Sequence, residues 1–260
     1  MKTIFTTVLI CITLCSVAQT GKQPAKSKTP TPIETHKKIY EMAVQNADAS
    51  VAINSLYYIV AEEGKTSLYR DTLALLYFNM ASYVQCELVA AGIVKDFADS
   101  IEKGQKLSVL EALALSQSSL GKVKEAIQSF EKLLSKTNEM YHGYRLAEMQ
   151  YTYQRVGEAM QTVLAAERLQ NSMKGKVSID LGNKQTQAVS LEAALQNLKG
   201  YILLKEYPDQ KAAAITAFKK ALEIQPDFVL AKNNLDYAEG KSPTEQQAPS
   251  QTPPPAPPNK

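Results

Sequence analysis

One spacing of small and large residues recurs along the middle of the chain. Ala126 is followed four residues later by Phe130 and three residues after that by Leu133, and a similar series begins at Ala159, 33 residues further along. Two antiparallel helices approach closely only where a small side chain lies at their crossing, and the large residue fills the space beside it. A spacing that returns at this interval therefore predicts an array of helix pairs.

Two further copies and the composition favour the same fold. Between residues 33 and 240 proline occurs only at Pro208 and Pro226, and the segment is rich in Ala, Leu, Glu, Lys and Gln, which predicts helix nearly throughout. The further copies of the spacing are Cys86, Ala90 and Ile93 near the start of the array, and Ala214, Phe218 and Ala221 near its end.

This pattern resembles the tetratricopeptide repeat. That family carries Leu-Gly or Leu-Ala and Tyr in the first helix of each pair, then Ala, a large apolar residue, Ala and Pro. The resemblance implies an all-α superhelix of antiparallel helix pairs, an α-solenoid. The matching residues are Leu73, Ala74, Tyr77 and Cys86; Leu113, Ala114, Gly121, Ala126 and Phe130; Leu146, Ala147 and Ala159; and Gly200, Ala214, Phe218, Ala221 and Pro226.

The resemblance also divides the chain into repeats. The predicted helical domain spans residues 34–240, with a weak first helix in its first repeat and extra residues near 100–106 and 206–210. Its repeats are predicted at about 34–65, 67–104, 107–138, 140–172 and 193–226, followed by a capping helix at 227–239.

Residues 174–191 interrupt the period. Val177, Ile179 and Leu181 alternate with polar residues just before Gly182 and Asn183. Alternation with a period of two is typical of a strand, and a Gly-Asn pair is typical of a tight turn. A small β-hairpin insertion is therefore predicted at this point.

Residues 1–18 have the composition of a signal peptide. Lys2 precedes an apolar run from residue 4 to 15, and Ala18 precedes Gln19 after small residues. The run is about a dozen residues, too short to cross a hydrocarbon core as a helix. Cleavage is expected between Ala18 and Gln19, which predicts an exported bacterial protein of the periplasm or cell envelope, or a secreted one. A retained membrane anchor is the alternative.

Both flanks of the domain are predicted to be disordered. Residues 19–33 and the proline-rich tail at 241–260 contain almost no large apolar side chains, so they cannot offset the entropy lost on ordering. The tail is either a spacer or a ligand for a proline-binding partner. The flanks also carry the excess of basic residues behind the formal net charge of +3. No nucleic-acid partner is therefore expected, and any membrane contact should be peripheral.

The sequence offers little catalytic chemistry. His36 and His142 have no neighbouring ligand at a metal-binding spacing, and there is no glycine-rich phosphate loop. Cys86, the one cysteine left after signal-peptide removal, stands where the repeat needs a small buried residue. We therefore expect no metal, no cofactor and no enzymatic activity.

The resemblance also implies a partner-binding surface. In the family, the second, fifth, ninth and twelfth positions of each repeat face the inside of the superhelix. This implies a mildly acidic, tyrosine-bearing concave face that binds a protein or peptide and repels a terminal carboxylate. Tyrosines packed between helices are the alternative. The residues are Asp71, Leu75 and Phe78; Glu111 and Leu115; Tyr141, Tyr144, Glu148 and Tyr151; and Asn197 and Tyr201.

The function expected from these features is that of an exported scaffold or adaptor. The alternative is a glycan-binding protein of an envelope uptake or assembly system, although tryptophan, the usual sugar-stacking residue, is absent. Ser100 and Thr72 each stand between an aspartate and an apolar residue, which resembles an acceptor for O-glycosylation of exported proteins. The partner and the oligomeric state stay open.

Overall fold

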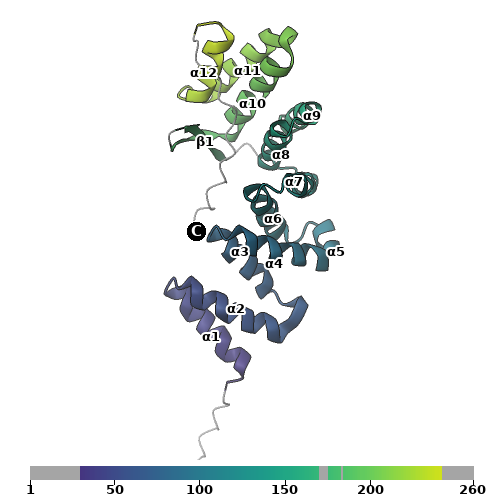
Figure 1. The fold of residues 1–260 in the computed structure, drawn as a ribbon, viewed down its shortest axis with the longest axis vertical. Coiled ribbons are helices and arrows are strands. Elements are labelled where there is room, and N and C mark those ends of the chain that lie inside the picture. The colour runs from purple at the N-terminus through teal and green to yellow at the C-terminus, as the bar shows by residue number, and fades with distance from the viewer. Residues whose placement is uncertain (1–29, 170–174, 183, 242–260) are drawn as a thin grey trace, which may run out of the picture.

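The protein is an elongated stack of antiparallel helix pairs (Figure 1). The structure is a computed structural model that describes residues 30–169, 175–182 and 184–241. It confirms the predicted α-solenoid with a small β-hairpin. The predicted signal peptide, its cleavage site at Ala18 and Gln19, and the tail from residue 242 onward lie outside the described residues.

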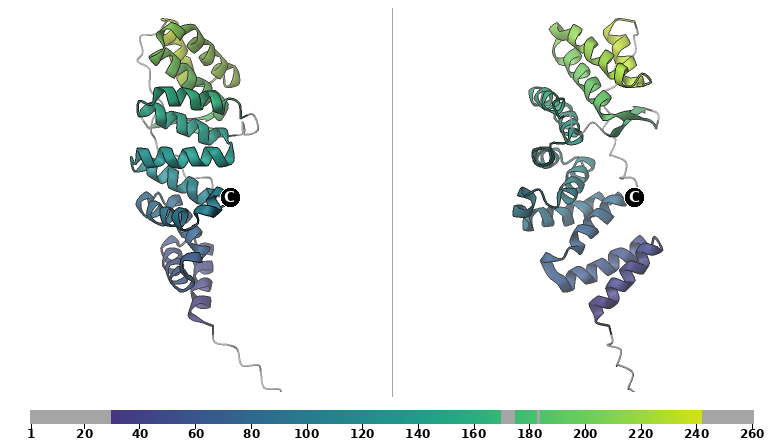
Figure 2. Two further views of the ribbon diagram at one scale, coloured as in Figure 1. Left: turned by 90° about the vertical axis from the view of Figure 1, so that its right-hand side faces the viewer. Right: turned by 180° about the vertical axis from the view of Figure 1, so that it is seen from behind.

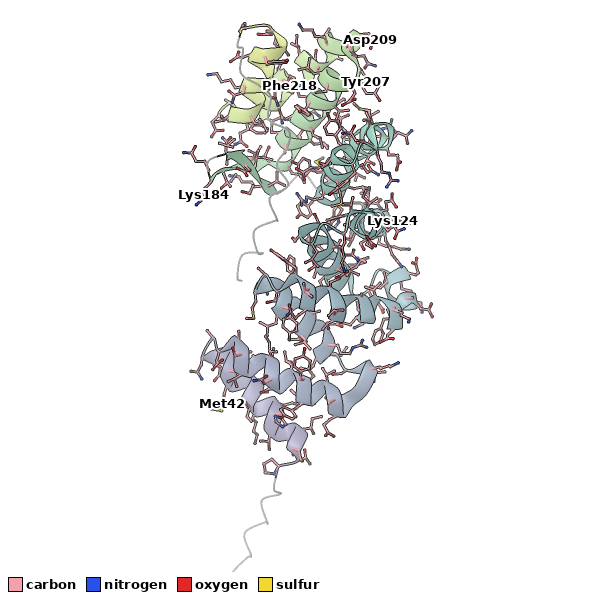
Figure 3. All side chains as sticks on the ribbon, in the orientation of Figure 1. Met42, Lys124, Lys184, Tyr207, Asp209 and Phe218 are labelled. Carbon is pink, nitrogen blue, oxygen red and sulfur yellow. The ribbon has the colours of Figure 1, made fainter. Side chains whose placement is uncertain are left out.

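Five helix pairs and a final helix follow one another along the described part of the chain. The pairs lie one above another in the left view of Figure 2, which is turned by 90° from Figure 1. Figure 3 places Met42 on the first pair and Phe218 on the fifth. The pairs are α1 (Pro32–Gln45) with α2 (Ala49–Glu63), α3 (Tyr69–Asn79) with α4 (Tyr83–Asp96), α6 (Leu107–Ser119) with α7 (Val123–Thr137), α8 (Met140–Thr152) with α9 (Val156–Ala166), and α10 (Leu191–Glu206) with α11 (Lys211–Ile224), followed by α12 (Val229–Ala238).

Within the described part of the chain, three short helices lie between these elements. The 3₁₀ helix η1 (Gly64–Thr66) follows α2, α5 (Ala98–Glu102) follows α4, and the 3₁₀ helix η3 (Pro208–Gln210) precedes α11. Two of them, α5 and η3, coincide with the stretches of extra residues in the sequence. The additional residues therefore lengthen the connections between helices and leave the helix pairs intact.

The turn inside each of the first four pairs has the same backbone geometry. Two residues after the first helix ends, Ala47, Ala81, Gly121 and Gln154 adopt φ values of 54°, 55°, 69° and 62°. The next backbone N–H returns to the helix end, as Lys122 N does to the carbonyl of Gln117 at 2.9 Å. This is a Schellman motif, which satisfies carbonyls that the helix leaves free. Only one of the four residues is glycine, the residue that adopts positive φ at least cost. At the other three positions, helix packing imposes this backbone conformation.

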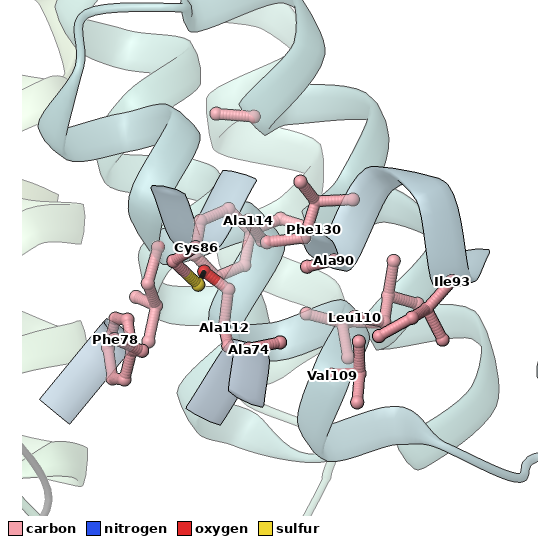
Figure 4. Close-up of a cluster of buried hydrophobic side chains, with 14 of the residues drawn as sticks. Ala74, Phe78, Cys86, Ala90, Ile93, Val109, Leu110, Ala112, Ala114 and Phe130 are labelled. Atoms are coloured by element: carbon pink, nitrogen blue, oxygen red, sulfur yellow. Dashed lines mark hydrogen bonds between the residues drawn. The ribbon is translucent and has the colours of Figure 1, made fainter. Parts of the chain in front are cut away.

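The core follows the small-and-large spacing of the sequence. All of the predicted structural positions are buried except Gly121, in its turn, and Pro226. Figure 4 shows part of this core, where Cys86 is fully buried and its thiol donates to the carbonyl of Ala112 at 3.8 Å. Burial raises the pKa of the Cys86 thiol. The residue therefore acts as a small apolar side chain.

The hairpin consists of β1 (Lys176–Gly182) and β2 (Gln185–Ser190), paired antiparallel with Val177 opposite Val189. It lies on the side of the stack where α6 and α8 lie (Figure 1). Val177 and Val189 are buried in the same core cluster as residues of α8 and α10. The Gln225 side chain also accepts from Ser190 N at 2.8 Å and donates to the carbonyl of Ala188 at 3.3 Å. The hairpin is thus part of the core of the fourth and fifth pairs.

The last helix, α12, covers the fifth pair. Leu230, Ala231 and Asn234 are buried, and the amide of Asn234 donates to Oδ1 of Asn197 on α10 at 2.9 Å. A terminal helix with one buried face and one polar face is the usual cap of a solenoid. Among the helices of the described residues, none is both long and apolar enough to cross a membrane.

Candidate functional site

The predicted partner-contacting positions divide into buried and partly exposed residues. Six of the eleven pack between helices: Phe78, Leu115, Tyr144, Glu148, Asn197 and Tyr201. Asp71, Leu75, Glu111, Tyr141 and Tyr151 are half-buried. Tyr144, for example, is only 2% exposed. The surface open to a partner is therefore smaller than the sequence implied.

The predicted acidic character of this face is largely compensated. Nζ of Lys106 lies 2.6 Å from Oδ2 of Asp71. Likewise, Nη1 of Arg145 lies 2.6 Å from Oε2 of Glu148. The expected repulsion of a terminal carboxylate therefore rests mainly on Glu111, whose side chain is 38% exposed.

Glu111 lies beside a buried histidine. Its Oε1 is 3.6 Å from Nε2 of His142, which is 3% exposed. On the other side of the ring, Nδ1 of His142 lies 2.8 Å from Oγ1 of Thr137. This arrangement fixes the imidazole between the third and fourth pairs. His142 therefore has a packing role in addition to its contact with Glu111.

A pocket opens between the third and fourth pairs, where α6 turns into α7 and α8 turns into α9. It contains about 410 Å³ of empty space, including space open to solvent. One wall is apolar and includes the ring of Tyr153, which is 41% exposed. The residues that line the pocket are Ser118, Val123, Arg145, Glu148, Met149, Thr152 and Tyr153.

An ion pair forms the polar part of the pocket. Glu148 Oε2 accepts from Arg145 Nη1 at 2.6 Å, and Glu148 Oε1 accepts from the hydroxyl of Tyr144 at 3.2 Å. The side chains of Arg145 and Glu148 are only 12% and 10% exposed. Burial raises the pKa of Glu148, and Arg145 and Tyr144 partly oppose this effect. Nε of Arg145 is buried and has no hydrogen-bond partner among the described residues.

A second aromatic group lies next along the stack, between α8 and α10. The hydroxyl of Tyr151 donates to Oε1 of Glu206 at 3.0 Å, and its ring meets Tyr201 edge-on at 5.7 Å. Burial raises the pKa of Tyr151 and of Tyr201. Nζ of Lys205 lies 6.0 Å from the ring centre of Tyr201. This group extends the half-exposed surface from the pocket toward the fifth pair.

Two residues of this region, Arg145 and Tyr153, were not predicted from the sequence. Arg145 and Tyr153 fall outside the repeat positions that the family resemblance assigns to partner contact. Arg145 stands three residues before Glu148, a spacing that places both side chains on one helix face. That spacing was the available signal for the ion pair. Tyr153 gave no comparable signal, because it follows the last residue of α8.

The predicted O-glycosylation sites, Ser100 and Thr72, both lie in helices. Ser100 lies in α5 and Thr72 in α3, and both are half-buried. Within residues 30–169, 175–182 and 184–241, no group of three or more His, Cys, Asp or Glu side chains could hold a metal ion.

Two segments of this solenoid match the model of a known repeat family. The tetratricopeptide repeat model matches residues 107–135 and 193–228, which include most of the third pair and most of the fifth. The two matched segments are tetratricopeptide repeats, and the stacked helix pairs around them support a tetratricopeptide repeat protein. No curated protein sequence matches the chain.

Solved structures show the same fold at low sequence identity. YrrB, described as a tetratricopeptide repeat protein with an unusual peptide-binding site, superposes with a TM-score of 0.57 at 12% identity, covering 76% of this chain and 89% of its own. MamA from Desulfovibrio magneticus RS-1 gives 0.55 at 11% identity, covering 76% and 97%. Another MamA structure gives 0.56 at 13% identity, covering 75% and 92%. These similarities concern the fold.

Proposed function

We propose that this protein is an exported scaffold that binds a segment of a partner protein at the pocket between its third and fourth helix pairs. The observation that carries the proposal is the pocket itself, which combines a nearly buried ion pair with an exposed tyrosine. Tyrosine and arginine are enriched where binding energy concentrates in protein interfaces. The pocket between Ser118 and Tyr153 is therefore the part of the surface best suited to hold a partner's side chain.

The fold supports a binding role. Tetratricopeptide repeat proteins are generally scaffolds, and YrrB, which shares the fold, has a peptide-binding site. The half-buried Tyr141 and Tyr151 lie on α8, the helix that also supplies Arg145, Glu148 and Met149 to the pocket.

We also propose that the protein has no catalytic activity. The carboxyl group of Glu148 is the one in the pocket, and burial raises its pKa. That carboxyl is already held by Arg145 and Tyr144. Acid–base catalysis usually needs a second titratable group to act with the first, and the residues that line this pocket include no other carboxyl group and no histidine.

Export is supported by residues 1–18, where Lys2, the apolar run and the small residues up to Ala18 follow the order of a signal peptide. On this proposal the partner belongs to the cell envelope. The chain is expected in the envelope fraction of the producing cells, with Gln19 as its first residue.

A pull-down with matched variants tests the binding site. Tyr153→Ala removes an exposed side chain of the pocket, and Leu164→Ala removes one that is 40% exposed on α9, the second helix of the same pair. Partners are recovered from envelope extracts with the full chain and quantified by mass spectrometry. Tyr153→Ala should lower recovery of a specific partner about tenfold, and Leu164→Ala should leave it unchanged. Equal recovery by all three chains would contradict the pocket assignment.

A further inference from the structure

The ion pair of the pocket has unused hydrogen-bonding capacity. A carboxylate offers about four acceptor sites, and Glu148 uses one for Tyr144 and one for Arg145. A guanidinium carries about five N–H donors, of which Arg145 gives one to Glu148. Free acceptors and free donors therefore lie next to each other in the recess.

The two charges of the pair restrict what can bind there. Glu148 opposes a ligand carboxylate, and Arg145 opposes a ligand ammonium or guanidinium group. Their 2.6 Å contact leaves the recess with no net charge. A neutral group that is both donor and acceptor can satisfy both residues, because its N–H can bond Glu148 while its oxygen accepts from Arg145.

The depth of the pocket and the residues that line it favour a side chain of the partner as the ligand over a backbone amide. The side chains of Arg145 and Glu148 are nearly buried, so a main chain passing over the surface would not reach them. Val123, Met149 and Tyr153 line the same pocket and provide apolar contact for methylene groups. The walls therefore suit a short apolar stem with a polar, uncharged end.

We propose that the pocket recognises a primary amide, the side chain of a glutamine or asparagine in the partner segment. The amide NH₂ donates to Glu148, and the amide oxygen accepts from Arg145. This inference rests on the proposed function, since it names the side chain that the binding pocket takes.

Peptide arrays test the inference. The probe is a set of immobilised dodecapeptides in which each ordinary amino acid is fixed in turn at the central position, with mixed Ala, Ser and Tyr flanks. The purified full chain should be retained about tenfold more by central Gln or Asn than by Glu, Lys or Leu. Leu164→Ala is the control variant and should keep this preference.

Glu148→Gln gives the sharper result. This change removes the negative charge at nearly constant shape and leaves Arg145 uncompensated, so the preferred central residue should become Glu. Circular dichroism checks that the variant is folded, and if it is not, the preference of the unaltered chain decides the matter.

The possible failures can be told apart. Retention without preference for amides, or a folded Glu148→Gln variant that still prefers Gln, would overturn the amide assignment and leave the scaffold function standing. Retention by no peptide, together with a pull-down that Tyr153→Ala does not change, would overturn both proposals.

Discussion

Replacing Phe218 with alanine should lower the free energy of unfolding by about 3–5 kcal/mol. The ring is fully buried and packs against α10 at Gly200. A Cβ atom at Gly200 would lie 2.6 Å from Cε1 of Phe218, so the ring occupies the space that a side chain on α10 would fill. Removal of the ring leaves a cavity that α10 and α11 can close only in part.

The loss should be confined to the end of the stack. Each repeat of a solenoid contacts only its neighbours, so the fifth pair and α12 should open before the rest. Chemical denaturation gives the total loss, and amide hydrogen exchange shows which helices lose protection. Leu164→Ala, at a partly exposed site, should change stability by less than about 0.5 kcal/mol. A loss below about 1 kcal/mol for Phe218→Ala would contradict this packing.

Replacing Arg145 with methionine should cost about 3 kcal/mol at neutral pH, because it leaves Glu148 buried without its cation. The cost depends on pH, and its sign follows from the pKa of Glu148, which burial already raises. A group whose pKa is raised on folding adds stability below its unfolded pKa and loses it as the pH rises through the folded pKa. The deficit relative to the unaltered chain should therefore be small at acidic pH and grow as the pH rises above the folded pKa of Glu148, which burial places above the usual glutamate value of about 4.3.

Denaturation curves across this pH range measure the effect. The matched control is the double variant Arg145→Met with Glu148→Gln, which has no carboxyl group in the pocket and should lose the added pH dependence. A deficit for Arg145→Met that stays constant from pH 4 to 8 would contradict the account of Glu148.

The repeat could be predicted from the sequence because close helix packing restricts the size of the residues at each helix crossing. Ala126 and Phe130 had to be small and large where helices cross, and both are fully buried. The hairpin was readable for the same reason, since Val177 and Ile179 alternate toward the core. The turns were less visible, because Ala47 and other non-glycine residues adopt the left-handed conformation under tertiary control.

The candidate site was only partly predictable. Repeat positions indicate which residues face inward, but they do not indicate which of them the rest of the chain covers. Asn197 is covered by α12 through Asn234. The charge of Asp71 is compensated by Lys106, which is 35 residues away in sequence. Contacts of this kind depend on the stacked structure and leave no local signal.

Two solenoids that share a fold do not necessarily bind the same partner. The three solved structures described above are 11–13% identical to this chain, and binding surfaces vary while repeat packing persists. The ion pair of Arg145 and Glu148 and the ring of Tyr153 are features of this chain. Its specificity therefore has to be measured at these residues.

The most direct test of the account is site-specific photocrosslinking in the producing cells. The crosslinker p-benzoylphenylalanine replaces Ser118 or Tyr153 in the pocket, and Leu88 or Leu164 at exposed positions on the second helices α4 and α9. The account predicts one shared crosslinked partner from both pocket positions and none from the two controls. Crosslinks to that partner only from Leu88 or Leu164 would contradict the claim that the pocket between the third and fourth pairs is the binding site.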